Sequence, residues 1–173
     1  MELYASQGFD ATTVAEIAAR AGLTERTFFR HFADKREVLF GGAGVLEGLL
    51  VRGTKEAPAD LGPVSAITFA LAEAAGEIFT GERRSFARHR QAIIAAHPDL
   101  RERELIKMAS LTSALAGALR DRGVAEPGAS LGAEAGVAVF KVSFERWVSG
   151  PGDRPLADFL RESLEGLKAA TAG

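Results

Sequence analysis

The chain has no cysteine and no long apolar run. Without cysteine there can be no disulfide framework, no thiolate metal site and no cysteine nucleophile. The absence fits a reducing cytoplasm, which is the location we expect. A membrane-spanning helix needs about 18 apolar residues in succession, and no such stretch occurs. Glu2 directly follows Met1, without a basic or apolar leader segment, so we expect no secretory signal.

The sequence also lacks an excess of charge of either sign. Its 21 Lys and Arg residues and 23 Asp and Glu residues give a net charge of −2, which argues against a chain that is polybasic throughout. Because 47% of the 173 residues are hydrophobic, the chain can bury a core as one large domain or two small ones, and wholesale disorder is excluded.

Sequence signatures of enzymes are absent as well. There is no Glu-x-x-His pair, no His-Glu-x-x-His zinc motif and no phosphate-loop lysine. The segment 41–44 is rich in glycine but follows no predicted strand, so it does not indicate a nucleotide loop. We therefore expect no enzyme, no cofactor and no metal site.

Apolar residues recur at three- and four-residue spacing almost throughout, which predicts an all-α protein. Glycine and proline divide this pattern into predicted helices near 1–6, 14–21, 25–32, 35–53, 64–80, 82–96, 99–122, 130–149 and 156–170. The first helices are short and those after residue 60 are long. We therefore expect a compact N-terminal module over residues 1–40 and a helical C-terminal domain over residues 41–173.

Two of the short helices form a helix-turn-helix pattern. Thr13 and Glu16 have the spacing of a capping box, which predicts the start of a helix. Gly22 is placed to end that helix in a left-handed conformation, and Leu23 follows as a buried turn residue. Thr24 supplies an N-cap for the second helix. Helix, glycine turn and helix in this order are typical of a helix-turn-helix unit.

The second helix has an apolar and a polar side. On a helical projection Phe28, Phe29 and Phe32 share one arc, which we expect to pack on the first helix. The opposite arc carries donors that can meet base edges and phosphates in a major groove: Arg26, Thr27, Arg30 and His31. Asp34 is expected to cap the next helix and leave the N–H groups near Lys35 and Arg36 free to face a phosphate.

The same residues form a long spaced pattern, Gly8-Phe9-x-x-Thr12-Thr13-Val14-x-x-Ile17-Ala18-x-x-Ala21-Gly22-Leu23-Thr24-x-x-Thr27-Phe28-Phe29-x-His31-Phe32-x-x-Lys35-x-x-Leu39. It resembles the DNA-binding domain of the tetracycline-repressor (TetR) family. The resemblance implies a homodimeric, ligand-responsive regulator, expected to repress, that binds a palindromic operator in double-stranded DNA. The DNA contacts that we expect from it are Thr13, Thr24, Arg26, Thr27, Phe29, Arg30, His31 and Lys35.

The sequence departs from the family pattern in three places. It begins inside the first helix, so we expect that helix to be truncated. Phe29 stands where the family commonly has a tyrosine that binds a phosphate through its hydroxyl. The predicted linking helix contains Gly41, Gly42 and Gly44. The charge balance also bears on the interpretation, since residues 1–40 hold five basic against six acidic residues. A helical ligand-binding dimer that no longer engages DNA is therefore the alternative interpretation.

The predicted helix 130–149 is apolar nearly all round, and a helix of this kind must be covered on most sides. We expect it to form a four-helix dimer interface with the last helix, through Val137, Phe140, Phe144, Phe159, Leu160 and Leu164. The alternative is a core within one subunit.

The middle helices 64–80, 82–96 and 99–122 are expected to enclose a small, hydrophobic or acyl-like effector. The candidate lining residues are Phe69, Phe79, Phe86, His89, Met108, Leu111 and Phe140, although periodicity does not separate lining from core. Residues 82–90 are strongly basic, which predicts a solvated face; the alternative is that Arg84 or His89 orients an effector carboxylate.

Overall fold

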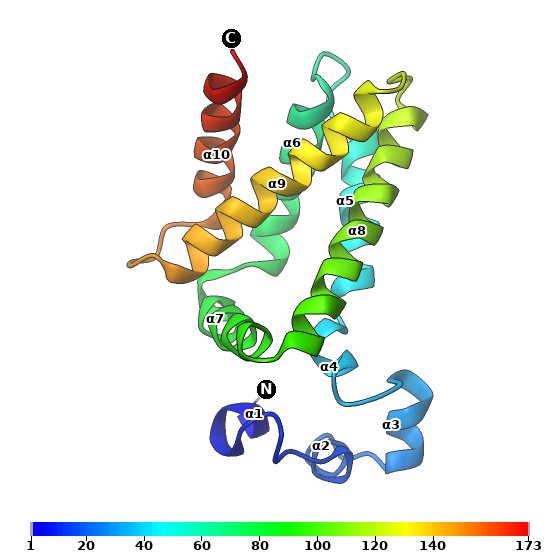
Figure 1. The fold of residues 1–173 in the computed structure, drawn as a ribbon, viewed down its shortest axis with the longest axis vertical. Coiled ribbons are helices and arrows are strands. Elements are labelled where there is room, and N and C mark those ends of the chain that lie inside the picture. Colours follow the sequence, from blue (N-terminus) through cyan, green and yellow to red (C-terminus); the bar gives the residue numbers. More distant parts are fainter. Residues whose placement is uncertain (1, 173) are drawn as a thin grey trace.

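The computed structural model describes residues 2–172, apart from the side chain of Glu82, and within this range it contains helices but no strands (Figure 1). The all-α prediction is confirmed. The helices are α1 (Glu2–Gln7), α2 (Val14–Arg20), α3 (Glu25–His31), α4 (Glu37–Phe40), α5 (Ala43–Glu56), α6 (Pro63–Ile78), α7 (Gly81–Ala96), α8 (Pro98–Asp121), α9 (Gly128–Ser149) and α10 (Leu156–Thr171). Met1 and Gly173, at the ends of the two predicted domains, lie outside the described residues.

The helix predicted over residues 35–53 is two helices in the structure. It ends at Phe40 and starts again at Ala43, with Gly41 and Gly42 between the two parts. Two adjacent glycines give up more backbone entropy in a helix than other residues do, and they contribute no side chain to packing. The prediction of one continuous linking helix was therefore wrong, and α4 is separated from α5.

The C-terminal domain has its core between α5, α6, α8 and α9, while α10 packs on α6 and α9. Two glycines of α9 allow it to approach α6 closely. A Cβ atom at Gly132 would lie 2.7 Å from Pro63, and one at Gly136 would lie 2.7 Å from Ile67. These contacts are within the subunit, so small residues on α9 stabilise the monomer core.

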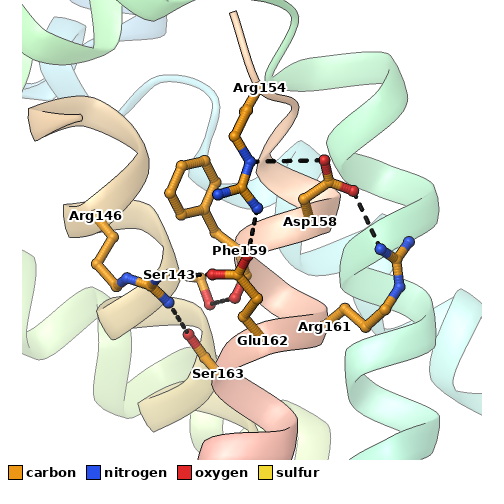
Figure 2. A network of polar contacts seen from close by, with 8 residues as sticks. All are labelled: Ser143, Arg146, Arg154, Asp158, Phe159, Arg161, Glu162 and Ser163. Atoms are coloured by element: carbon orange, nitrogen blue, oxygen red, sulfur yellow. Dashed lines mark hydrogen bonds and ion pairs between the residues drawn. The ribbon is translucent and has the colours of Figure 1, made fainter. Parts of the chain in front are cut away.

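Helix α10 is held on α9 by a polar network around one aromatic ring (Figure 2). Arg146 of α9 and Arg154, which precedes α10, both donate to the carboxylate of Glu162. Their guanidinium carbons lie 5.3 and 4.7 Å from the centre of the Phe159 ring. Beneath the ring, the buried Ser143 hydroxyl donates to the Phe159 carbonyl oxygen over 3.1 Å. The network covers Phe159 and explains its burial within one subunit.

The N-terminal module, residues 2–40, rests on α7 and the start of α8 (Figure 1). A small apolar cluster joins the two parts and consists of Tyr4, Phe9, Leu39, Phe40, Ile94 and Leu100. Ion pairs surround this cluster, with Arg36 bound to Asp99 over 3.1 Å and Glu37 bound to Arg103. The module is therefore packed against the end of α7 and the start of α8, in addition to its covalent connection to α5.

The basic segment 82–90 is not simply a solvated face. Arg84 donates to the Trp147 carbonyl and Arg88 to the Val148 carbonyl, at 2.7 and 2.8 Å, near the end of α9. Arg90 donates to the Leu39 carbonyl at 2.7 Å, near the end of α4. Carbonyl groups at the C-terminal ends of helices have no partner within the helix and favour positive charge. These arginines therefore close the ends of two other helices, which a sequence pattern on α7 alone does not reveal.

Candidate nucleic-acid interface

The turn between α2 and α3 has the hydrogen bonds that its sequence predicts. The Thr13 hydroxyl accepts from the Glu16 N–H, and the Glu16 carboxylate accepts from the Thr13 N–H at 2.8 Å, so the capping box is confirmed. Gly22 has φ = 68°, a left-handed conformation that glycine adopts at little cost. The Leu23 N–H donates to the Ala18 carbonyl at 2.8 Å, which closes the end of α2.

Helix α3 begins at the predicted cap and turns its polar side outward. The Thr24 hydroxyl accepts from the Thr27 N–H. Phe28 is the buried anchor of α3, and its ring centre lies 5.2 Å from that of Phe32. The basic side chains Arg26, Arg30 and His31 are exposed, and Thr27 is half-buried. Three donor-bearing side chains thus project from one short helix, as a major-groove reader requires.

Two apolar residues of this unit do not lie where we expected them. Phe29 is 53% exposed and contacts Phe28 edge to face at 5.5 Å, instead of packing on α2. Leu23 is 42% exposed and is not a buried turn residue. Phe28 is the residue of α3 that is buried, and its ring contacts those of Phe29 and Phe32. The exposed Phe29 ring therefore belongs to the outer surface, next to the basic side chains.

Lys35, predicted as a DNA contact, is engaged inside the module. Its ammonium donates to the carbonyl oxygens of Phe9, Asp10 and Thr12 at 2.8, 3.0 and 2.9 Å, and lies 4.7 Å from the centre of the Phe9 ring. A lysine ammonium has three hydrogens, and all three have carbonyl partners here. This corrects our interpretation, because Lys35 joins the loop after α1 to the segment before α4.

The N–H groups expected to face a phosphate near Lys35 are also engaged. Those of Arg36 and Glu37 both donate to the Asp34 carboxylate, at 2.8 and 3.2 Å. Asp34 therefore closes the turn that leads into α4, whereas the N-cap of α4 itself is Arg36, without a side-chain hydrogen bond. These two N–H groups are not free to face a phosphate.

Tyr4 is a structural residue that sequence reasoning missed. Its hydroxyl donates to the Lys35 carbonyl oxygen at 2.7 Å, and burial, together with the nearby Asp34 charge, raises the pKa of Tyr4 to about 12. It is the one tyrosine in the chain, and its place in the apolar pattern of residues 1–9 was the available signal.

The predicted effector residues lie partly in the packed core and partly on the surface of the part of the chain that the structure describes. Phe79, Met108, Leu111 and Phe140 belong to the packed core of the C-terminal domain. Phe69 and Phe86 are exposed, as is His89, whose Nδ1 lies 2.8 Å from the Ser85 carbonyl oxygen of its own helix. Among the described residues, a cavity of about 210 Å³ lies between α6, α7 and α10, and a groove of about 290 Å³ lies between α6, α9 and α10. Of the predicted residues, Phe79 alone lines one of these spaces.

The predicted dimer residues are covered within the subunit as well. Val137, Phe140, Phe159 and Leu160 are buried in the monomer core, and Phe144 and Leu164 are packed against it. These contacts lie within one subunit, and the predicted dimer interface of α9 and α10 stays a prediction. The apolar residues that α9 leaves open are others, since Leu131 is 65% and Val142 51% exposed.

Two further features bear on function. Among the described residues, no group of three or more His, Cys, Asp and Glu side chains is arranged to hold a metal ion. In the same part of the chain, no single helix is long and apolar enough to cross a membrane, although the bent pair 63–78 and 83–96 meets the criteria of length and composition.

Comparison with known proteins relates both parts of the chain to bacterial regulators. Residues 1–40 match the bacterial regulatory proteins of the tetR family, and residues 61–172 match the MftR C-terminal domain. Over 82 residues the chain is 34% identical to the HTH-type transcriptional regulator TcmR of Streptomyces glaucescens. That match covers 47% of this chain and 36% of TcmR, so it spans about a third of the relative's length.

Solved structures share the fold over nearly the whole chain. FadR of Thermus thermophilus, a TetR-family transcriptional repressor in complex with lauroyl-CoA, is similar with a TM-score of 0.61 at 24% identity, covering 100% of this chain and 91% of FadR. The TetR-family regulator PfmR of the same organism has a TM-score of 0.51 at 21% identity, covering 95% of this chain and 91% of PfmR. At these identities the two likenesses show the fold alone.

Proposed function

The chain belongs to the tetR family of bacterial regulatory proteins, and on this basis we propose that it is a homodimeric transcriptional repressor that binds a palindromic operator and is released by a small hydrophobic effector. Members of this family are transcriptional regulators and not enzymes. The observation that carries the proposal is the outward face of α3, with Arg26, Arg30 and His31 exposed next to Phe29.

Each side chain of this face has a partner in a major groove. A guanidinium can donate two hydrogen bonds to the O6 and N7 atoms of guanine, and Arg26 and Arg30 are free to extend to them. Phe29 lacks the hydroxyl of a tyrosine, but its exposed ring can contact a thymine methyl group. Thr13 and Thr24 begin α2 and α3, and we assign them to the phosphate-facing ends of these helices.

A dimer follows from the short length of α3, the helix that we assign to the major groove. Helix α3 has seven residues and can contact only a few base pairs, whereas two copies about 34–36 Å apart can read a palindrome. The surface that we assign to the partner is the open side of α9, with Leu131, Ala138 and Val142, together with the adjoining groove beside α10. An exposed apolar stripe of this kind is typical of a subunit interface.

The effector acts through linkage between the two domains. An effector that binds more tightly to the conformation that cannot bind DNA lowers the affinity of the protein for DNA. DNA in turn lowers the affinity of the protein for the effector by the same factor. FadR, which shares the fold, is in complex with lauroyl-CoA, and this supports a hydrophobic effector as the class to test first.

The test is a gel-shift titration with the intergenic DNA upstream of the gene. Arg26→Ala and Arg30→Ala should each weaken binding by about tenfold or more, since a bidentate contact to a base is worth about 1–3 kcal/mol. Arg52→Ala, which removes an exposed arginine of α5, is the matched control and should bind as the wild type does. Equal affinity of all four proteins would show that α3 is not the reader.

Sedimentation of the same proteins tests the dimer independently. Val142→Glu should give a monomer that binds the operator weakly, whereas Arg26→Ala should remain a dimer. If the wild type sediments as a dimer but ignores its own upstream DNA even at low salt, the alternative of a ligand-binding dimer that no longer binds DNA is correct.

A further inference from the structure

A cavity of about 210 Å³, open on one side, lies outside the core of the C-terminal domain, where α6 ends and where α7 and α10 begin. One wall is a stripe of α6 formed by Ala72, Ala75, Gly76 and Phe79, at positions that share a helix face. Leu156 and Ala157 of α10 add to this apolar surface. The space exists because three of the four residues on the α6 stripe are alanine or glycine, and a Cβ atom at Gly76 would meet no neighbouring heavy atom within 4 Å.

Two arginines, Arg84 and Arg154, are among the residues that line the cavity. Arg84 is only 7% exposed, and its partners among the described residues are the neutral carbonyl oxygens of Trp147, Gly150 and Gly152. These bonds fix the group in place but do not neutralise its charge. Buried charges in proteins are normally paired, so a fixed guanidinium beside an open space favours an anion.

Arg154 is the second cation, and it already pairs with Glu162 and, more distantly, with Asp158 at 3.9 Å. Asp153 is the one acidic residue that lines the cavity. The lining therefore combines an apolar wall with two arginines and one aspartate, and Arg84 is the arginine whose partners among the described residues include no carboxylate, which suits a ligand with an apolar body and a single negative group.

We propose that this cavity binds a compact monocarboxylate of about the size of benzoate, with its ring against the α6 stripe and its carboxylate at Arg84 and Arg154, and that this ligand is the effector of the regulator. The size follows from the volume, because an apolar cavity of about 150 Å³ holds one benzene molecule. A long acyl chain does not fit in 210 Å³. The effector role rests on the proposed function, whereas the binding site does not.

The position of the cavity connects it with the DNA-binding module. Helix α7 begins at the cavity with Gly81 and Arg84, and its second half carries Arg90 and Ile94 against α4 and the apolar cluster of the N-terminal module. A ligand that displaces the first turn of α7 therefore acts on a helix whose other end holds that module.

Binding can be measured without DNA, because the chain has a single tryptophan near the site. The ring centre of Trp147 lies 6.0 Å from that of Phe79, which lines the cavity. Titration with benzoate should change the tryptophan fluorescence and saturate. Neutral benzyl alcohol should bind about tenfold more weakly, because it cannot form a charge-assisted pair with the guanidinium groups. No saturable change with benzoate, or equal affinity for both probes, would overturn the proposal.

Two variants locate the site. Gly76→Leu should fill the cavity and abolish benzoate binding, while Gly48→Leu places the same side chain at another helical glycine without near neighbours and should bind normally. Arg154→Gln should weaken benzoate severalfold and leave benzyl alcohol unchanged. Thermal melting of each variant verifies its fold, and unaltered benzoate binding by a folded Gly76→Leu protein would show that the ligand sits elsewhere.

The effector role has a separate readout. Saturating benzoate should lower the affinity of the wild type for its upstream DNA and leave the DNA affinity of Gly76→Leu unchanged. Any effect of lauroyl-CoA on DNA affinity should be the same for the wild type and for Gly76→Leu. If benzoate binds the wild type but not Gly76→Leu, and DNA affinity does not respond, the binding site stands and the effector role is overturned. If neither protein binds DNA, the proposed function fails and the fluorescence result still decides the site.

Discussion

The N-terminal module and the C-terminal domain are both helical, yet they are stabilised by different means. The helices of the module have between four and seven residues, and those of the domain have between 14 and 24. Helices shorter than about 12 residues are marginal in isolation. The module therefore depends on caps and on its contacts with α7 and α8, while the domain buries a large apolar cluster between long helices.

This difference shows why the basic face of α3 can remain open. Phe28 and Phe32 occupy the inward side of α3, and Lys35 and Tyr4 join the module through backbone carbonyls. Such polar attachments leave the outward side chains free to meet DNA. In the domain, by contrast, almost every large apolar side chain that we had assigned to a function is used for packing.

The comparison predicts its largest effect in the core of the domain. Leu119→Ala should lower the free energy of unfolding by about 2–5 kcal/mol, because Leu119 is fully buried. Urea unfolding measures this change. Leu105 is on the same helix and 62% exposed, so Leu105→Ala should change stability by less than about 0.5 kcal/mol. Similar losses for the two variants would contradict a core built by burial.

The contact between the two regions should give the next largest effect. Arg90 donates to the Leu39 carbonyl, pairs with Glu104 over 3.0 Å and lies 5.1 Å from the centre of the Phe40 ring. Arg90→Ala should therefore weaken docking of the N-terminal module by about 1.5–3 kcal/mol. Hydrogen exchange should become faster in α1 and α4 and remain unchanged in α6 and α9. Equal acceleration in both regions would show that they unfold as one unit.

A pair of glycine variants tests local strain, one glycine lying in the module and the other just after it. Gly22 has φ = 68°, so Gly22→Ala should destabilise the protein by about 1–2 kcal/mol. Gly42 has φ = −87° and open space around it, and Gly42→Ala should be neutral or stabilising by up to about 1 kcal/mol. The urea midpoint of Gly22→Ala should therefore fall, whereas that of Gly42→Ala should stay unchanged or rise. A lower midpoint for Gly42→Ala would mean that the break before α5 is required.

The smallest effect concerns pH at the contact between the regions. A hydrogen bond with the Ile93 carbonyl, and after it the side chain and charge of Asp10, raise the pKa of His97 above its ordinary value of 6.5. Because the folded state favours the protonated ring, this contribution is complete below the ordinary pKa and is lost as the pH rises through the raised value.

The stability difference between wild type and His97→Gln should accordingly shrink as the pH rises above 6.5, the ordinary pKa of histidine. A difference that grows with pH would reverse the assigned sign.

Local features were predicted well because they depend on residues close in sequence. The Thr13 capping box, the left-handed Gly22 and the Thr24 cap each involve hydrogen bonds over three to five residues, and all three are present. The identity of the exposed donors on α3 follows from the same periodicity. Phe29 was misplaced because a helical projection gives directions and does not tell how much space the neighbouring helix offers.

Long-range features were predicted poorly. The arginines of α7 were assigned to solvent, although three of them close the ends of α4 and α9 from far along the chain. The contacts that bury Val137, Phe140, Phe159 and Leu160 within one subunit were not predicted. Helices α6, α8 and α10 pack against α9, and α10 is held there by Arg146 and Arg154 (Figure 2).

The order of amino acids alone determined that the chain is helical, where its first helices begin and end, and which side of α3 carries donors, since each depends on backbone propensities and contacts within a turn or two. Only the packing of distant helices decided which apolar side chains are hidden, which arginines close helix ends, and where a cavity remains. Burial is a property of several segments at once, and no single segment contains the information about what will lie against it.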